Sequence, residues 1–225
     1  MNLLRTFVLA TMVFMTISAK GQCKFCKSKS YEDFIDDHWE KLDTVYCKKR
    51  SKSQKFWWGG KDYTLTTGNK DLDKVLKYEA FIVMQSDTAY LNCRNVRHDT
   101  VLLGKGYTKA KRFGDHGLLF VSQFANKKTA QDIMAAGYVA GTLGSLSAAS
   151  DYEKRQVCYI ISSGADGIGY INTRMIDDEM IEEMMEKNII KDGGLYLKYL
   201  SEGKKWQRIH ASHVIPILEE AGLLK

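Results

Sequence analysis

The chain has 225 residues, 44% of them hydrophobic and 27% charged, and a formal net charge of +6 at pH 7. This length is enough for one well-buried core or two small ones, and we expect one. The charge is too small for the basic footprint of a dedicated nucleic-acid-binding protein, so we expect no such function.

The first 21 residues have the order of a secretory signal peptide. Residues 1–5 include one Arg, residues 6–17 are apolar and uncharged, and Ser, Ala and Gly occur in the next four positions. The apolar part is shorter than the about 20 residues that a membrane-spanning helix needs. We therefore predict an exported protein, periplasmic or secreted, cleaved after Gly21 or, as second choice, after Ala19. This signal holds two basic residues and no acid, so 31 basic and 27 acidic residues remain, a charge of +4.

All five cysteines lie beyond the predicted signal, where export would permit disulfides. We interpret residues 22–30 as a flexible leader in which Cys23 or Cys26 forms a disulfide with Cys47. A redox or zinc role for the Cys23-x-x-Cys26 pair is an alternative. A lipid anchor on Cys23 is another, although the residues before it do not fit the lipoprotein pattern.

A helix is predicted over residues 31–42, because apolar residues recur there at steps of three and four, and His38 is interpreted as a packing residue on this face. A run in which cations adjoin aromatic residues follows. This composition suits an anionic polymer or a membrane interface, and it also fits a solvated loop that leads into a buried aromatic strand. The candidate binding residues are Lys48, Lys49, Arg50, Lys52, Lys55, Trp57 and Trp58.

Apolar runs joined by turn residues predict three consecutive β-hairpins, and therefore an antiparallel sheet. Their strands are expected at 79–85 and 88–93, 101–113 and 118–124, and 157–162 and 168–172. Helical periodicity predicts helices over 71–78, 176–186, 195–200 and 210–221.

Residues 129–150 are almost bare of bulky side chains and contain Gly137-x-x-x-Gly141, a spacing that lets two helices approach closely. We interpret the segment as a helix or loop packed against the sheet. A membrane-associating element is the alternative, although the run is short for a span.

Motifs for catalysis and metal binding are weak in this chain. His210-x-x-His213 is the best metal-binding pair, but zinc or iron needs a third ligand, so we expect no metal and no cofactor. Cys93 with His98 is the best pair of a thiol and a base, but no motif of a nucleophile surrounds it. Catalytic residues stay unassigned, and we expect a protein that is not an enzyme.

Strand ends and glycine turns at residues 89–94 and 103–110, the small-residue segment after Phe124, and the hairpin at 159–171 form a pattern. Together they resemble a family of exported proteins of unknown function from Gram-negative gut bacteria. The resemblance spans residues 78–225 and implies a location more than an activity.

We expect an α+β fold with an antiparallel, hairpin-built sheet, flanking helices and C-terminal helices, in a single domain at residues 31–225. The expected function is that of a binding or envelope-associated module whose partner is an anionic polymer or an envelope component. The alternatives are a hydrolase that acts on envelope or host polymers, and a membrane-associating protein that acts through residues 129–150.

Overall fold

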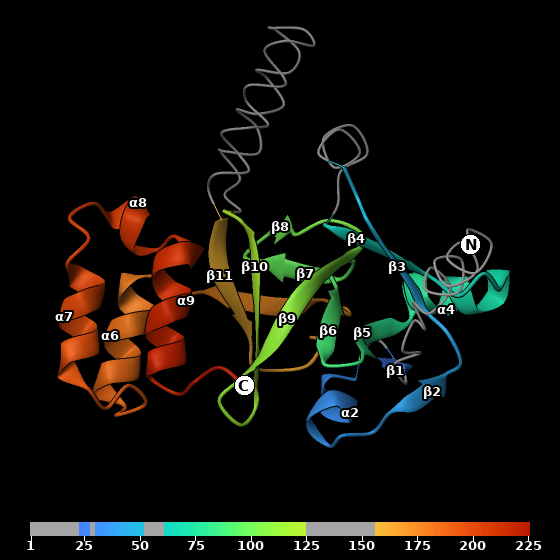
Figure 1. Cartoon of the computed structure of the whole chain (residues 1–225), viewed down its shortest axis with the longest axis horizontal. Coiled ribbons are helices and arrows are strands. Elements are labelled where there is room, and N and C mark those ends of the chain that lie inside the picture. The colour runs from blue at the N-terminus through green and yellow to red at the C-terminus, as the bar shows by residue number, and fades with distance from the viewer. Residues whose placement is uncertain (1–22, 28–29, 52–60, 125–155) are drawn as a thin grey trace, which may run out of the picture.

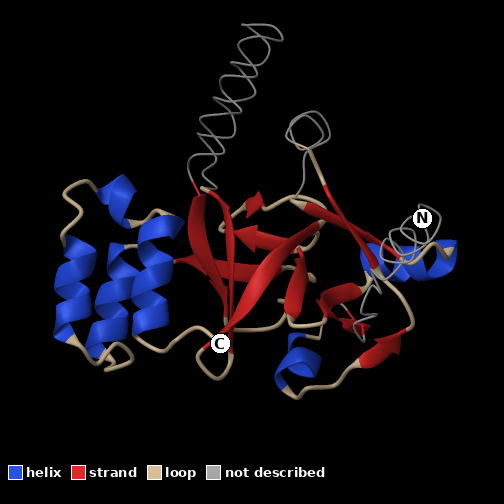
Figure 2. Cartoon of the chain, viewed as in Figure 1, coloured by secondary structure: helices blue, strands red, loops and turns tan. Residues whose placement is uncertain are grey.

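The computed structural model describes residues 23–27, 30–51, 61–124 and 156–225 and has an α+β fold (Figures 1 and 2). A curled sheet occupies the centre, and a layer of C-terminal helices lies against one end of it. Two helices from the N-terminal half lie at the other end. The predicted fold class is therefore confirmed.

The described residues contain one 12-stranded sheet. Ten strands follow one another in the order β2 (Glu40–Leu42), β1 (Cys23–Lys27), β5 (Ala80–Gln85), β6 (Thr88–Asn92), β9 (Tyr107–Phe113), β10 (Gly117–Gln123), β11 (Gln156–Ile161), β12 (Ile171–Met175), β7 (Val96–His98) and β8 (Val101–Leu102). The strands β3 (Tyr46–Lys49) and β4 (Tyr63–Thr66) pair with each other, and β4 also pairs with β9. The helices are α2 (Tyr31–Ile35), α4 (Lys70–Tyr78), α6 (Asp178–Glu186), α7 (Gly193–Leu200), α8 (Lys205–Arg208) and α9 (Ala211–Glu220).

The three predicted hairpins form, and each has a residue of positive φ in its turn. Ser86 has a φ of 51° between β5 and β6, Gly114 has 57° between β9 and β10, and Gly169 has 85° between β11 and β12. The sheet is antiparallel at these hairpins, as predicted. One pair differs, because β12 runs parallel to β7 with Ile171 opposite Val96.

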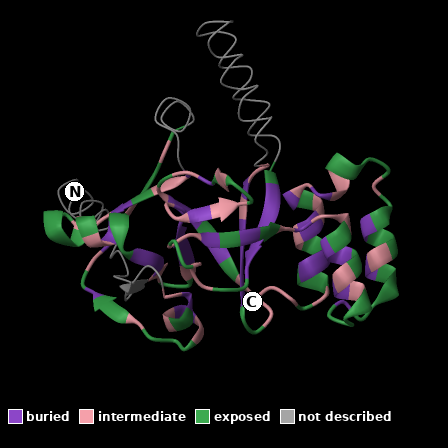
Figure 3. Ribbon diagram, turned by 180° about the vertical axis from the view of Figure 1, so that it is seen from behind, coloured by how far each residue is buried: buried purple, intermediate pink, exposed green. Residues whose placement is uncertain are grey.

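Three apolar clusters fill the described structure, and Figure 3 shows their buried residues along the strands and on the inner sides of the helices. Alternate residues of a strand point to opposite faces of the sheet. In β10, Leu118 and Phe120 belong to the cluster that includes Phe34 of α2, whereas Leu119 belongs to the cluster under α6, α7 and α9. The third cluster lies between α4, β3, β4 and the sheet. The opposite faces of the central strands therefore pack against different groups of helices.

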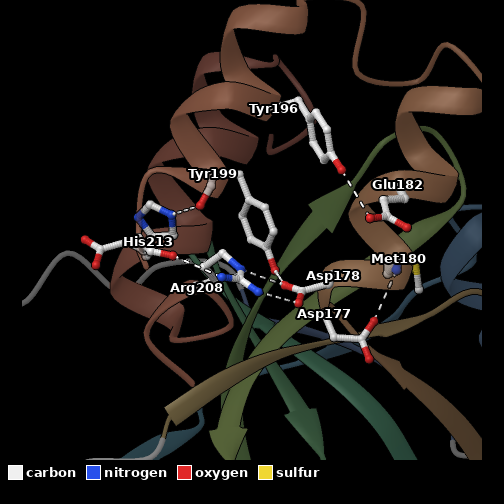
Figure 4. Close-up of polar contacts among 9 residues, drawn as sticks. Asp177, Asp178, Met180, Glu182, Tyr196, Tyr199, Arg208 and His213 are labelled. Atoms are coloured by element: carbon white, nitrogen blue, oxygen red, sulfur yellow. Dashed lines mark hydrogen bonds and ion pairs between the residues drawn. The ribbon is translucent and has the colours of Figure 1, made fainter. Parts of the chain in front are cut away.

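A polar cluster around Asp178, at the start of α6, fastens the C-terminal helices to one another (Figure 4). Arg208 of α8 donates from Nε and Nη2 to the two carboxylate oxygens at 3.1 and 2.8 Å, and the hydroxyl of Tyr199 in α7 donates at 2.7 Å. The hydrogen bonds from Arg208 are the largest cause that holds the pKa of Asp178 below its usual value, although partial burial opposes them. One carboxylate therefore joins three helices.

The helix predicted over residues 31–42 is wrong in its second half. The helix α2 ends at Ile35, and residues 40–42 form β2 instead. Asp37 adopts a left-handed conformation with a φ of 57°, which ends a helix, and the acids Asp36 and Asp37 adjoin its negative C-terminal end. His38, which was expected to pack on an apolar face, is exposed.

The N-terminal segment and the second hairpin also differ from the prediction. Residues 23–27 form β1 between β2 and β5, rather than part of a structureless leader. The strand expected over 101–113 is interrupted, because Gly104 and Gly106 have φ values of 101° and 96°, far from extended backbone. The short strand β8 and the strand β9 replace it. The helix α8 was not predicted, and β12 begins at Ile171 rather than at residue 168.

Candidate functional site

The basic run that the sequence singled out is described only in part. Lys48 and Lys49 are exposed on β3, Arg50 is half-buried, and Tyr46 of the same strand is 62% exposed. The other predicted binding residues, which lie outside the described residues, are Lys52, Lys55, Trp57 and Trp58. The described part of the run therefore places cations and one aromatic ring on the β3–β4 pair.

Hydrogen bonds connect this pair of strands to the turn before β9. The Arg50 N–H donates to the Asp62 carbonyl at 2.7 Å, and the Lys61 N–H donates to the Lys105 carbonyl at 2.7 Å. The Arg50 guanidinium donates to the Lys61 carbonyl at 3.4 Å. A Cβ atom on Gly106 would lie 2.9 Å from a backbone oxygen of β4, so a glycine is required for this close approach.

Tyr78, the last residue of α4, lies at the centre of a cationic surface. Its side chain is 48% exposed, and the Arg94 Cζ and Lys77 Nζ atoms lie 4.4 and 4.9 Å from its ring centroid. The hydrogen bond and charge of Lys77 are the largest causes that hold the pKa of Tyr78 below its usual value, and Arg94 and Lys105 add to them. We call Arg50, Lys77, Tyr78, Arg94 and Lys105 the Tyr78 surface.

Three cations of the Tyr78 surface have no acidic partner among the residues that the structure describes. They are Lys77, Arg94 and Lys105. Some other exposed cations are paired, as Lys198 is with Glu220 and Lys225 with Asp115, whereas Lys191 and Lys204 are exposed without an acidic partner among the described residues. An uncompensated group of cations produces a positive potential that attracts anions.

Asn92 of β6 holds Tyr78 and Arg94 in place relative to each other. Its Nδ2 atom donates to the carbonyl oxygens of Leu76 and Ala80, at 3.2 and 2.9 Å, which lie on either side of Tyr78 in the sequence. Its Oδ1 atom accepts the N–H of Arg94 at 3.2 Å. Asn92 is 7% exposed, so the end of α4 and the start of the Arg94 turn are joined through a buried side chain.

A hollow of about 300 Å³, counted together with its open mouth, adjoins Arg94 and Asn95. The side-chain amide of Asn95 forms no hydrogen bond to any described residue, and Phe81 and Ala165 contribute apolar parts of the lining. The hollow therefore combines a guanidinium group and an amide group, both able to donate, with an apolar wall. We call it the Arg94 hollow.

The turn between β11 and β12 forms another wall of the hollow, and Asp166 holds this turn. The Asp166 carboxylate accepts the N–H groups of Tyr170 and Ile168 at 2.9 and 3.1 Å, and the Arg97 guanidinium donates to it at 2.7 Å. The bond from Tyr170 is the largest cause of the lowered pKa of Asp166. Arg97 is thus neutralised, in contrast to Arg94.

The two histidines that were weak metal candidates have separate roles. The Nδ1 atom of His210 accepts the N–H of Ser212 and caps α9, whereas the Nε2 atom of His213 lies 3.0 Å from the Tyr199 carbonyl. Among the described residues, no group of three His, Cys, Asp or Glu side chains could hold a metal ion. His210 is therefore the N-cap of α9, and His213 is a packing residue on the same helix.

The predicted thiol and base pair of Cys93 and His98 is not supported. Burial raises the pKa of Cys93 to about 12, so its thiol stays protonated at neutral pH, and a thiol is a poor nucleophile. The Nδ1 atom of His98 lies 3.2 Å from the Thr173 carbonyl, and its ring packs edge-on against Tyr159. Both residues are explained by packing.

The predicted disulfide is not shown. Cys47 is a half-buried free thiol. Cys23 and Cys26 lie on β1, but their side chains are outside the described part of the chain. Pairing of Cys47 with one of them stays a prediction.

A buried polar pair that was not predicted joins β10 to the segment before β4. Lys61 is 5% exposed and Ser122 is 4% exposed, and the Lys61 Nζ atom donates to the Ser122 hydroxyl oxygen. No motif marks either residue, because the two are far apart in the sequence and each stands alone in its segment.

Comparison with known proteins places residues 28–225 in one family, whose description is "Family of unknown function (DUF6563)". No curated protein and no solved structure matches the chain. The match confirms the expected membership of a family of unknown function. It says nothing of export or of gut bacteria. No described helix is long and apolar enough to cross a membrane, and residues 129–150 lie outside the described part.

Proposed function

We propose, for a chain that belongs to the DUF6563 family of unknown function, that it binds an anionic polymer through the Tyr78 surface without catalysing a reaction. The observation that carries this proposal is the group of three cations around an exposed ring, none with an acidic partner among the described residues. Lys48 and Lys49 are further exposed cations, on β3.

The physical basis is the combination of charge with a flat aromatic face. Each exposed cation contributes little alone, because water and salt screen it, but several cations that contact one polymer act together. The Tyr78 ring, which is 48% exposed, adds apolar contact area beside the cations. Such binding weakens as the ionic strength rises.

Export of the protein, and therefore an envelope component as the polymer, is part of this proposal. Its support is the signal-peptide pattern in the first 21 residues. Cleavage after Gly21 would leave the whole Tyr78 surface in the mature chain.

The test of the proposed function is retention of the full chain on immobilised heparin, used as a model polyanion. We expect the double variant Lys77→Gln/Lys105→Gln to elute at a clearly lower salt concentration than the unmodified protein. The matched control is Lys191→Gln/Lys204→Gln, which removes the same charge from exposed residues of the C-terminal helical region. An equal shift in both variants would show a general charge effect and contradict the proposal, as would no shift in either.

A second candidate function is hydrolysis of an acyl bond at Ser122. One observation favours it: the hydroxyl of Ser122 lies beside the Lys61 amine, and a serine beside a lysine base is a known nucleophilic pair. It ranks second because both side chains are almost fully buried. Fluorophosphonate labelling followed by peptide mass spectrometry tests it. Labelling of Ser122 that is lost in Lys61→Met would support hydrolysis, and an unlabelled Ser122 would remove this candidate.

A further inference from the structure

The Arg94 hollow offers a more specific form of recognition than the surface around it. The Tyr78 ring covers the guanidinium of Arg94 on one side, with the Cζ atom 4.4 Å from the ring centroid. The covered face is closed to a ligand, whereas the edge, where the N–H groups lie in the plane of the group, can donate to one.

We infer that the Arg94 hollow binds a carboxylate group carried by the anionic polymer. This inference rests on the proposed function and names the chemical group that the site takes. A carboxylate is planar and accepts two parallel N–H groups from the edge of a guanidinium. The oxygens of a phosphate or sulfate are tetrahedral, so some of them would lie outside that plane, towards the ring.

The second donor is the side chain of Asn95. Asn95 lines the hollow, and its side-chain amide has no hydrogen-bond partner among the described residues, so binding an anion breaks no bond that it forms there. The main chain of Asn95 is fixed, because its carbonyl accepts the N–H of Ile171 at 2.8 Å. The hollow therefore has two donors on a backbone that is already positioned.

The size of the hollow limits what enters it. Its space of about 300 Å³ includes open solvent, and its enclosed part of about 10 Å³ holds about one water molecule. The carboxylate therefore binds at the mouth of the hollow, and the rest of the polymer lies along Tyr78 and the lysines. Gly169 in the opposite wall leaves open space where a side chain would project.

The experiment is a titration of the isotope-labelled full chain by NMR at constant ionic strength. The probes are sodium glucuronate, N-acetylalanine and inorganic phosphate, and the signals followed are the Arg94 Nε–H and the Asn95 side-chain amide. We expect saturable shifts with both carboxylates and a weaker response to phosphate. Two carboxylates of different origin separate a sugar-acid source from a peptide terminus.

The variants define the result. Arg94→Gln is expected to weaken glucuronate binding by about tenfold or more, since a hydrogen bond to a charged group contributes about 1.5–3 kcal/mol. Asn95→Ala should weaken it by a smaller factor. Lys191→Gln, which removes one charge from an exposed residue of the C-terminal helical region, should change it by less than about threefold. Shifts that do not saturate, shifts that persist in Arg94→Gln, or a preference for phosphate would overturn the inference.

The two proposals fail in different ways. If the lysine variants keep full heparin retention while Arg94→Gln loses glucuronate, polymer binding by the surface is wrong and the carboxylate site stands. If the lysine variants lose retention while glucuronate binds no better than chloride, the surface stands and the carboxylate site is wrong.

Discussion

Replacing Asn92 with Ala is expected to lower the free energy of unfolding by about 3 kcal/mol. The substitution removes the buried amide that donates to the Leu76 and Ala80 carbonyls and the oxygen that accepts from the N–H of Arg94. Each buried group left without a partner costs about 1–3 kcal/mol. The Leu76 carbonyl keeps one donor, the Tyr107 hydroxyl, which limits the total.

Urea unfolding followed by circular dichroism measures this difference. The matched control is Asn95→Ala, three residues further along the same segment, where the side chain forms no hydrogen bond to a described residue. We expect the control to change the free energy of unfolding by less than about 0.5 kcal/mol. If Asn92→Ala were as stable as Asn95→Ala, Asn92 would not be the link that positions Tyr78 and Arg94.

The second large effect concerns the C-terminal helices and depends on pH. Asp178→Asn is expected to lower stability by about 2 kcal/mol at pH 7, because charge-assisted hydrogen bonds from Arg208 become neutral ones. About a quarter of the Asp178 side chain is exposed, so the loss is smaller than for a fully buried ion pair.

The sign of the pH effect follows from the lowered pKa of Asp178 in the folded protein. An unfolded aspartate has a pKa of about 3.9, so the stabilisation is fully present above that value. It is lost as the pH falls through the lower pKa of the folded state. The difference in stability between the unmodified protein and Asp178→Asn should therefore shrink between pH 7 and the acid range.

Urea unfolding at a series of pH values tests this expectation, with Glu186→Gln at the exposed end of the same helix as the control. Other acids, such as Glu183 with a pKa lowered to about 2 by Arg174 and Lys187, contribute equally in all variants. A difference for Asp178→Asn that stays constant with pH would show that its charge is not what joins the helices.

Local patterns predicted the hairpins and most helices, because their determinants lie close together in the sequence. The turn at Ser86 between β5 and β6 is set by neighbouring residues, and the structure has it. The second half of the helix expected over 31–42 does not form, because Asp37 adopts a left-handed conformation and ends the helix. The apolar periodicity of this segment gave no sign of that break. Parallel pairing of β7 with β12 was not predictable, because no local pattern connects segments 75 residues apart, such as Arg97 and Asn172.

The Tyr78 surface could not be predicted from the sequence. A cationic and aromatic surface was expected on one continuous run, whereas the described surface draws its cations from separate segments. Lys77 ends α4, Arg94 follows β6, and Lys105 precedes β9. None of these residues stands out in a sequence where basic residues are frequent. Only folding of the strands between them brings them to one ring.

The parallel pairing of β7 with β12 also constrains the order in which the protein can fold as its chain emerges, from the ribosome or, in an exported protein, from the translocon. The hairpins β5–β6 and β9–β10 are complete once residue 123 has emerged, and their own strand pairs need no later part of the chain. The strand β7 lies between them in sequence, but its partner β12 arrives only with residues 171–175. Until then β7 has an open edge, and open strand edges are where nascent chains pair wrongly. The nascent chain therefore carries an incomplete sheet through more than a fifth of its length, from residue 123 to residue 175.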